Sequence, residues 1–274
     1  MKQFILRFCQ FVFSFLGNDF KRKTIVHLAT AFKVNLLGLA YNNVGILNYK
    51  NLQVSGEQHV IKKVLPKYMG ASPVLFDVGA NIGNYSKVLH NTFPSADIFS
   101  FEPNTVTYEA LEKNLGEFRN IRRCNLGLSR ETKEASIYFE QQNHISPFTT
   151  LYKELVPEQD VLEMSIHLTT LDNFCYEHGI EEIDFLKIDT EGHEYDVLMG
   201  AKEMIRNQKV KIIQFEFNEM HVISRVFLRD LYLLLKGYDF YRLLPNGLLP
   251  LNPYHSRFEI FQFQNILCVR EGLV

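Results

Sequence analysis

The stretch LFDVGANIGNYSKVL, residues 75–89, departs most from generic globular sequence. A short apolar run contains Asp77, a turn with glycines at Gly79 and Gly83 follows, and a helical pattern begins after it. Glycine adopts backbone dihedrals that other residues avoid, and it lacks the side chain that would keep a ligand from the main chain. The pattern therefore predicts a buried strand, a ligand-binding turn and a helix whose N-terminus points at the ligand.

The composition is that of an ordinary globular protein. The chain has 274 residues, of which 46% are apolar and 22% are charged, so it can bury a sizeable core. Its 29 Lys and Arg residues nearly balance 31 Asp and Glu residues. Nucleic acid is therefore disfavoured as a partner, because proteins that bind a phosphate backbone usually carry a basic excess. Four cysteines without metal-ligand spacing indicate free thiols in a reducing cytoplasm.

The N-terminal segment is apolar, but polar residues interrupt it along one helical stripe. They are Gln3, Arg7, Gln10 and Ser14. The apolar run stops at Gly17, whereas a membrane-spanning helix needs about 20 apolar residues. A signal peptide is not expected either, because it would have an uninterrupted apolar centre and a cleavage site of small residues. We expect an amphipathic helix that packs on its own domain, mediates homo-oligomerisation or contacts a membrane surface peripherally.

Two parts of the chain differ in their pattern. Residues 1–69 predict a helical N-terminal extension, whereas residues 70–274 alternate strands with helices. The expected strands are residues 74–78, 97–102, 121–128, 183–189 and 211–217, with a hairpin-like insertion at 135–152 and an antiparallel pair at the end. This order predicts an α/β fold with a mostly parallel sheet and an antiparallel edge hairpin. Ligands bind such sheets at the carboxyl ends of the strands.

The glycine turn does not match the dinucleotide fingerprint. That fingerprint is G-x-G-x-x-G, whereas residues 79–83 read GANIG, and Asp77 precedes the first glycine. An acid at this place repels a pyrophosphate and attracts a cation such as an amino group. Glu102 ends the second strand, where a carboxylate accepts hydrogen bonds from both ribose hydroxyls of a nucleoside. S-adenosylmethionine, a cationic nucleoside without phosphate, fits both acids, and NAD does not.

Five blocks of sequence together resemble the FkbM family of S-adenosylmethionine-dependent methyltransferases. They are VLFDVGANIGNYSKVL, FSFEPN, CNLGLS, the block from TTLDNF through KIDTEGHEYDVLMGA, and IQFEFN. The resemblance covers roughly residues 70–220. It implies a Rossmann-like class I methyltransferase fold with a seven-stranded sheet. It also implies O-methyl transfer to a hydroxyl of a sugar, a glycan or a small secondary metabolite.

The expected site residues lie at the carboxyl ends of the strands. The cofactor-binding set is Asp77, Gly79, Asn81, Gly83, Glu102, Pro103, Asn125, Ser129 and Asp189. The catalytic set is Asp189, His193 and Glu216, with Asp189 as the positioning acid and His193 as the proton acceptor, because histidine ionises near working pH. The same three residues could instead hold Mg²⁺, although no metal is predicted. Lys187 is expected to form a structural ion pair, and the insertion to cover the acceptor.

Two alternative functions remain open from the sequence. One is methylation of a different acceptor, such as a protein; adenine N6 is disfavoured because Asp189–Gly192 replaces the Asn/Asp-Pro-Pro-aromatic run. The other is a methyltransferase-like module that binds S-adenosylmethionine without turning it over. The joint presence of Asp77, Glu102 and Asp189 favours a working enzyme.

Overall fold

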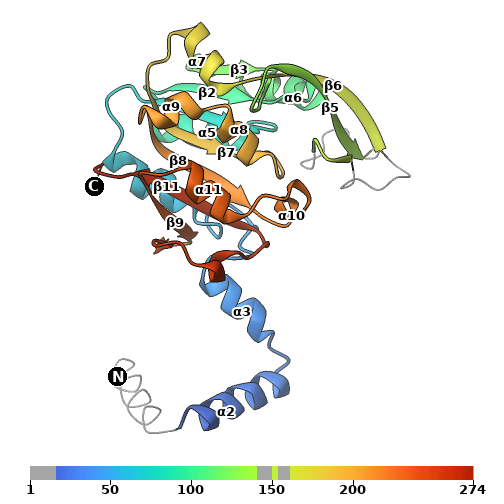
Figure 1. The fold of residues 1–274 in the computed structure, drawn as a ribbon, viewed down its shortest axis with the longest axis vertical. Coiled ribbons are helices and arrows are strands. Elements are labelled where there is room, and N and C mark those ends of the chain that lie inside the picture. The colour runs from blue at the N-terminus through green and yellow to red at the C-terminus, as the bar shows by residue number, and fades with distance from the viewer. Residues whose placement is uncertain (1–16, 141–149, 154–160, 274) are drawn as a thin grey trace. The chain divides into compact units, whose positions relative to one another are not determined.

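The computed structural model describes residues 17–140, 150–153 and 161–273 (Figure 1). The helix predicted over residues 1–16 therefore lies outside the described residues. The chain divides into two compact units, Met1–Val44 and Gly45–Val274. This division lies before the boundary at residue 69 that the sequence predicts, because residues 45–69 belong to the larger unit.

In its described part, residues 17–44, the smaller unit has the helices α2 (Asn18–Ala31) and α3 (Leu36–Asn43). The side chain of Asn35 caps α3 by accepting a hydrogen bond from the backbone N–H of Gly38 at 2.9 Å. Among the described residues, no helix by itself has the length and apolar character of a membrane span. The pair α2 and α3, bent by 109°, meets that criterion only when the two are taken together.

An eight-stranded sheet forms the centre of the larger unit, in the order β10-β9-β11-β8-β7-β1-β2-β3 (Figure 1). Its strands are β1 Val74–Val78, β2 Asp97–Phe101, β3 Ile121–Cys124, β7 Ile183–Ile188, β8 Val210–Phe217, β9 Tyr238–Leu244, β10 Gly247–Pro250 and β11 Gln264–Arg270. The strands from β3 to β8 are parallel, and β11, β9 and β10 are antiparallel. The predicted α/β class is confirmed. Seven strands were expected; the eighth is the short edge strand β10.

Helices cover both faces of the sheet. One face packs against α7 (Leu171–His178), α8 (Glu194–Met199), α9 (Lys202–Arg206) and α11 (Leu228–Leu234). The other packs against α5 (Asn84–Thr92), α6 (Thr105–Leu115) and the helical segment 57–67, made of α4 (Glu57–His59), η1 (Val60–Val64) and η2 (Leu65–Lys67). Successive strand residues point to opposite faces, so Leu75 joins one core and Phe76 the other. The parallel strands are continuously apolar because both faces are buried.

A second, three-stranded sheet has the order β4-β6-β5. Its strands are β4 Gly127–Leu128, β5 Lys133–Glu140 and β6 Val161–Thr169. The single strand predicted over 121–128 is wrong, because Asn125 Nδ2 donates to the backbone carbonyls of Glu102 and Pro103 and the chain then leaves the large sheet. The sequence analysis also missed β6, which pairs with β5 and makes the insertion a hairpin.

Two predicted helices are interrupted. The helix after β7 breaks into α8 and α9 at Gly200, where a Cβ atom would lie 2.0 Å from the carbonyl oxygen of Ser129. The segment from Ser224 to Tyr238 has helical periodicity but becomes helical only at Leu228, because Arg225 adopts a left-handed conformation with φ of 57° that ends α10 (Met220–Ser224). Both breaks come from packing and backbone geometry, which helical periodicity does not report.

Gly79 is where β1 and the end of β7 approach most closely. Its φ is +77°, and a Cβ atom there would lie 1.8 Å from the carbonyl oxygen of Asp189. The glycine is therefore required by the packing of the two strands as well as by the turn.

We expect Gly79→Ala to destabilise the protein by about 3 kcal/mol or more, because the substitution adds both steric overlap and backbone strain. Urea unfolding measures the change. Gly70→Ala is the matched control, since no atom lies within 4 Å of its added Cβ, and we expect it to change stability by less than about 1 kcal/mol. Equal effects of the two substitutions would contradict this role of Gly79.

Candidate active site

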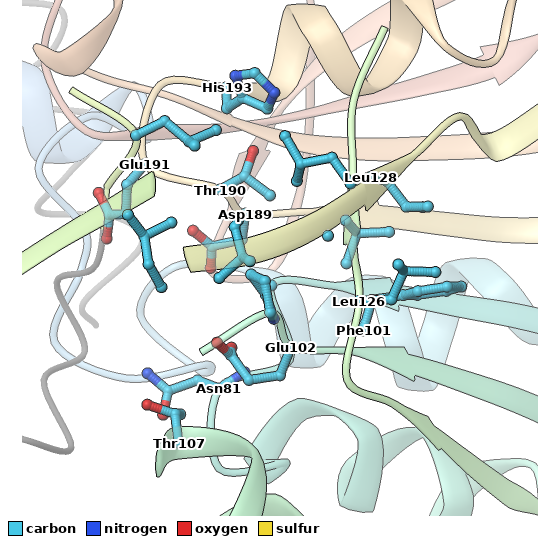
Figure 2. Close-up of a pocket in the computed structure, with 18 of the residues that line it drawn as sticks. Asn81, Phe101, Glu102, Thr107, Leu126, Leu128, Asp189, Thr190, Glu191 and His193 are labelled. Atoms are coloured by element: carbon cyan, nitrogen blue, oxygen red, sulfur yellow. The ribbon is translucent and has the colours of Figure 1, made fainter. Parts of the chain in front are cut away.

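A pocket of about 250 Å³ opens at the carboxyl ends of β1, β2, β7 and β8 (Figure 2). The predicted site residues that line it are Gly79, Asn81, Glu102, Pro103, Asp189, His193 and Glu216. Four other predicted residues, Asp77, Gly83, Asn125 and Ser129, do not line it. The rule that ligands bind at this edge of a parallel sheet therefore located the site.

The glycine turn offers no free backbone donors to a phosphate. The N–H groups of Gly79 and Ala80 donate to the carbonyl of Phe101, and that of Gly83 donates to the carbonyl of Ala80. The N–H of Asn81 donates to Glu102 at 3.0 Å. The N–H of Ile82 donates to the side chain of Asn81 at 2.7 Å. A pyrophosphate needs such groups unpaired, so the exclusion of a dinucleotide holds for a stronger reason than the missing glycine.

Glu102 directly follows β2, and each of its two carboxylate oxygens accepts a hydrogen bond from the main chain. Its carboxylate accepts hydrogen bonds from the N–H groups of Asn81 and Asn104, each at 3.0 Å. Burial raises the pKa of Glu102 to about 7, although both backbone bonds lower it. The carboxylate is thus held in place with lone pairs still available to a ligand hydroxyl.

Asp77, which the sequence predicts as a cofactor-binding residue, does not line the pocket. Its side chain is fully buried, and its positive partner is the ammonium of Lys187, 3.4 Å away. Ser86 Oγ donates to the other carboxylate oxygen at 2.6 Å. Lys187 also contacts Asp189 at 3.1 Å, and Asp189 is the partner that is exposed to the pocket. The ion pair predicted for Lys187 is therefore confirmed.

Lys187 remains charged although it is buried. Burial alone would lower its pKa, but the nearby carboxylates of Asp189, Asp77 and Glu57 raise it above its usual value. Glu57 comes from the helical segment 57–67, where Gln214 Nε2 donates to it at 3.2 Å. A buried cation among three acids thus lies behind Asp189, which is the one of these four residues that lines the pocket.

The other three predicted contacts have structural roles. Gly83 starts α5, and its added Cβ would lie 2.6 Å from Leu115 Cδ1, so this glycine makes room for helix packing. Asn125 binds the carbonyls that follow Glu102, as described above. Ser129 Oγ lies 2.9 Å from His193 Nε2 and is buried.

His193 is a poor candidate for the proton acceptor in this geometry. One ring nitrogen contacts Ser129, and the other, Nδ1, lies 3.4 Å from Asp196 Oδ2. Burial also lowers the pKa of His193. Nε2 is occupied by Ser129 and Nδ1 is fully buried without a hydrogen bond among the described residues, so neither nitrogen can reach an acceptor hydroxyl.

Acidic residues line the side of the pocket towards β8. Glu191 and Glu216 both line it, together with Asp189. Burial, together with the charges of Asp189 and Glu194, raises the pKa of Glu191 to about 8. Burial also raises the pKa of Glu216 well above its ordinary value, with Asp189 and Glu191 adding to the effect. This wall suits a cationic ligand, and it supplies groups that can exchange a proton near neutral pH.

Sequence reasoning missed Glu191 as a site residue and missed Thr107 altogether. Thr107 lies on α6, and Figure 2 shows it beside Asn81 and Glu102 at one end of the pocket. Its side chain is 1% exposed, and its hydroxyl has no hydrogen-bond partner in the part of the chain that the structure describes. A threonine inside a helix gives no sequence signal for this role. The apolar walls were also missed; they are Leu126, Leu128, Ile137, Leu151, Ile166 and Leu168.

Metal binding finds no support in the described ranges. No group of three or more His, Cys, Asp or Glu side chains in residues 17–140, 150–153 and 161–273 is arranged to hold a metal ion. Asp189, His193 and Glu216 share the pocket without forming such a group.

A pocket of this kind, acidic and without a cradle for phosphate, at the end of a sheet with this strand order, defines a class I methyltransferase. Residues 77–240 match the Methyltransferase FkbM domain. The chain belongs to this family, as its resemblance implied, and it is a methyltransferase.

The chain is similar to several characterised relatives. It is 26% identical over 202 residues to "Methyltransferase sdnD" of Sordaria araneosa, covering 60% of this chain and 78% of that protein. It is 24% identical over 193 residues to "2-O-methyltransferase NoeI" of Sinorhizobium fredii, covering 64% and 76%. It is 28% identical over 160 residues to "Hexuronic acid methyltransferase AglP" of Haloferax volcanii, covering 58% and 62%. A solved FkbM methyltransferase from Methylobacillus flagellatus aligns at 14% identity with a TM-score of 0.45, over 80% of this chain and 52% of that one.

The unpaired hydroxyl of Thr107 predicts opposite effects on stability and on binding. Thr107→Val removes a buried hydroxyl that has no partner, so we expect the ligand-free protein to gain about 1 kcal/mol. The same substitution removes a bond to the bound nucleoside, so we expect affinity for S-adenosylhomocysteine to fall roughly fivefold to tenfold. Thermal unfolding and calorimetry measure the two effects, and Thr107→Ser serves as the control that keeps the hydroxyl. A loss of ligand-free stability in the valine variant would show that the hydroxyl is already satisfied.

Proposed function

We propose that the protein transfers a methyl group from S-adenosylmethionine to a hydroxyl of a sugar, a glycan or a small secondary metabolite. The observation that carries the proposal is the pocket itself, in which Glu102 offers a carboxylate while every backbone N–H of the turn from Gly79 to Gly83 is already paired. Such a pocket fits a cationic nucleoside better than a phosphorylated one.

The residues that would hold S-adenosylmethionine lie on two sides of the pocket. Glu102 would accept bonds from the ribose hydroxyls, with Thr107 and Asn81 beside it, and the apolar walls would enclose the adenine. The carboxylates of Asp189 and Glu191 face the remaining space, where the positive charges of the ligand would be stabilised. When bound, S-adenosylmethionine supplies an electrophilic methyl group, so the protein's task is alignment and proton removal.

The proposed acceptor class rests on the relatives and on the chemistry of the pocket. Two relatives are named for 2-O-methyl transfer and for methylation of a hexuronic acid. A hydroxyl is a weak nucleophile that benefits from a nearby base, and the acidic wall provides carboxylates. The expected cover of the acceptor is partly described: Leu151, from the insertion, lines the pocket, whereas residues 141–149 lie outside the described residues.

Binding and turnover test this proposal separately. We expect calorimetry to detect binding of S-adenosylmethionine and S-adenosylhomocysteine and no binding of NAD. We expect radiolabelled methyl transfer to at least one member of a panel of sugars, uronic acids and hydroxylated metabolites. Binding of S-adenosylmethionine without methyl transfer to this panel, or to an equally broad panel of proteins, would instead support a non-catalytic module. Binding of NAD in place of S-adenosylmethionine would overturn the assignment.

The pKa of Glu102 predicts how binding depends on pH. Ribose hydroxyls favour the ionised carboxylate, so binding lowers a pKa that burial has raised to about 7. Affinity for S-adenosylhomocysteine should therefore rise between pH 6 and pH 8, and below about pH 7 it should fall by up to tenfold per pH unit. In Glu102→Gln the affinity should be lower, and this part of the pH dependence should disappear. An unchanged pH profile in Glu102→Gln would remove Glu102 from the ribose site.

A further inference from the structure

We propose that Glu191 is the base that accepts the proton of the substrate hydroxyl, an inference that rests on the proposed O-methyl transfer. Glu191 follows Asp189 by two residues and lines the same pocket (Figure 2). His193, the base expected from the sequence, contacts Ser129 Oγ through Nε2, and its Nδ1 is fully buried, so neither ring nitrogen is accessible to a substrate. The proton must therefore pass to a different group.

The backbone holds Glu191 in a left-handed conformation. Its φ is +52°, a left-handed value that non-glycine residues rarely adopt. Gly192 continues the turn with φ of +96°, and a Cβ atom there would lie 2.9 Å from Met220 Cβ. Strained residues of this kind cluster at functional sites, where the surrounding structure maintains them.

The loop around Glu191 is braced from both sides. Thr150 Oγ1 donates to the carbonyl of Glu191 at 3.5 Å, and Tyr152 donates to the carbonyl of Gly192 at 3.3 Å. On the other side, the N–H of Thr190 donates to Glu194 at 2.7 Å. These contacts fix the main chain, and a fixed main chain holds the carboxylate of Glu191 at the pocket.

Glu191 also differs from the other pocket carboxylates in its partners. Asp189 pairs with Lys187, Glu216 accepts from Asn218 Nδ2 at 2.5 Å, and Glu102 accepts from two backbone N–H groups. Within residues 17–140, 150–153 and 161–273, no hydrogen bond or ion pair engages the carboxylate of Glu191. Both of its carboxylate oxygens are therefore available to accept a substrate proton.

The electrostatic surroundings suit a base that works near neutral pH. The charged and titratable groups that face Glu191 from neighbouring elements are Lys187 of β7, Asp189 directly after β7, His193 and Glu194 at α8, Glu216 of β8 and Glu219 before α10. Burial and the negative charges raise the pKa of Glu191 to about 8, and Lys187 opposes them. A carboxylate of this basicity takes a hydroxyl proton more readily than an ordinary glutamate does.

The proposed step balances in atoms and charge. The acceptor oxygen forms a bond to the methyl carbon, the bond from that carbon to the sulfonium sulfur breaks, and the hydroxyl proton moves to the Glu191 carboxylate. The products are a methyl ether, the neutral thioether S-adenosylhomocysteine and protonated Glu191, which returns its proton to water.

The test compares Glu191→Gln with wild type on the acceptor that the panel identifies. We expect kcat at saturating S-adenosylmethionine to fall about 10²-fold to 10⁴-fold, while calorimetry still detects binding of S-adenosylhomocysteine. Because the base must be deprotonated, wild-type kcat/KM, which reports the ionisation of the free enzyme, should rise with pH to a plateau with a midpoint near 8. In Glu191→Gln this limb should vanish. Carbon-13 NMR of protein labelled at the glutamate carboxyls should lose a titration near pH 8 in the same variant, without any acceptor present.

Glu219→Gln is the matched control, because Glu219 is exposed, does not line the pocket and carries the same charge. It should retain kcat and move the midpoint to lower pH, since one repelling charge is gone. A Glu191→Gln enzyme within fivefold of wild type would overturn the proposal, as would a loss of the pH limb in Glu216→Gln alone. If wild type binds neither S-adenosylmethionine nor its product, the proposed function fails instead.

A separate observation concerns the smaller unit. Nine of the fifteen large apolar side chains that are exposed among the described residues belong to it, although it is a small part of the chain. They are Phe20, Ile25, Val26, Leu28, Phe32, Val34, Leu36, Leu37 and Leu39. Phe32 is 75% exposed and Leu37 is 61% exposed. An apolar surface of this density marks an interaction site.

The charge of the same segment identifies the partner. Residues 1–44 contain six Lys or Arg residues and one acid, Asp19, whereas the rest of the chain contains 23 basic and 30 acidic residues. A second copy of this segment would place like charges together. An anionic bilayer surface accommodates both features, because basic residues attract its headgroups while apolar side chains enter the interface. We infer that α2 and α3 dock on an anionic membrane surface.

Co-sedimentation of the full chain with vesicles tests this docking. We expect binding to vesicles of equal phosphatidylglycerol and phosphatidylcholine, and at least tenfold weaker binding to phosphatidylcholine alone. The double substitution Phe32→Ser with Leu37→Ser should weaken binding at least tenfold, whereas Val222→Ser with Ile223→Ser, an exposed apolar pair elsewhere, should not. Absence of binding to the anionic vesicles would overturn the inference. A dimer in light scattering that the first pair dissociates, without vesicle binding, would assign the surface to a second copy.

Discussion

The buried ammonium of Lys187 is the interaction on which the site depends. It lies in the central strand β7, where its Cα is paired in register with that of Asp77 on β1, and its side chain contacts both Asp77 and Asp189. Breaking a buried pair by removing one partner typically costs about 3–5 kcal/mol, because the other charge is left uncompensated. The cation therefore joins the two strands whose ends form the pocket, and it neutralises the acid that would otherwise lie charged in the core.

This arrangement divides the acids of the site into two groups. The buried carboxylate of Asp77 pairs with Lys187 and accepts a hydrogen bond from Ser86, so its role is structural. Asp189, Glu191 and Glu216 face the pocket, and burial together with their mutual repulsion raises the pKa of Glu191 and Glu216. One strand end thus provides a rigid support, and the following loop provides carboxylates that exchange protons. A cationic methyl donor and a hydroxyl acceptor require both.

The sequence predicted those features that lie along single elements. The strand with Asp77, the turn with Gly79, the acid Glu102 and the ion pair of Lys187 all follow from local pattern, and all are confirmed as positions in the fold. What it could not predict depends on contacts between distant segments. The partner of Asp77, the occupied N–H groups of the turn, the unpaired hydroxyl of Thr107 and the break at Gly200 each require two parts of the chain to be placed together. The local sequence pattern therefore predicts where the pocket lies, whereas contacts between distant segments determine which side chains line it.

A crystal structure of the protein with S-adenosylhomocysteine would test this account most directly. We expect the ribose hydroxyls within hydrogen-bond distance of Glu102, the Thr107 hydroxyl bonded to the ligand, and Lys187 still between Asp77 and Asp189. A ligand in direct contact with Asp77, or a Lys187 side chain turned away from Asp77 to bind the ligand, would contradict the account. Both results would show that the buried pair of Asp77 and Lys187 binds the ligand instead of supporting the pocket.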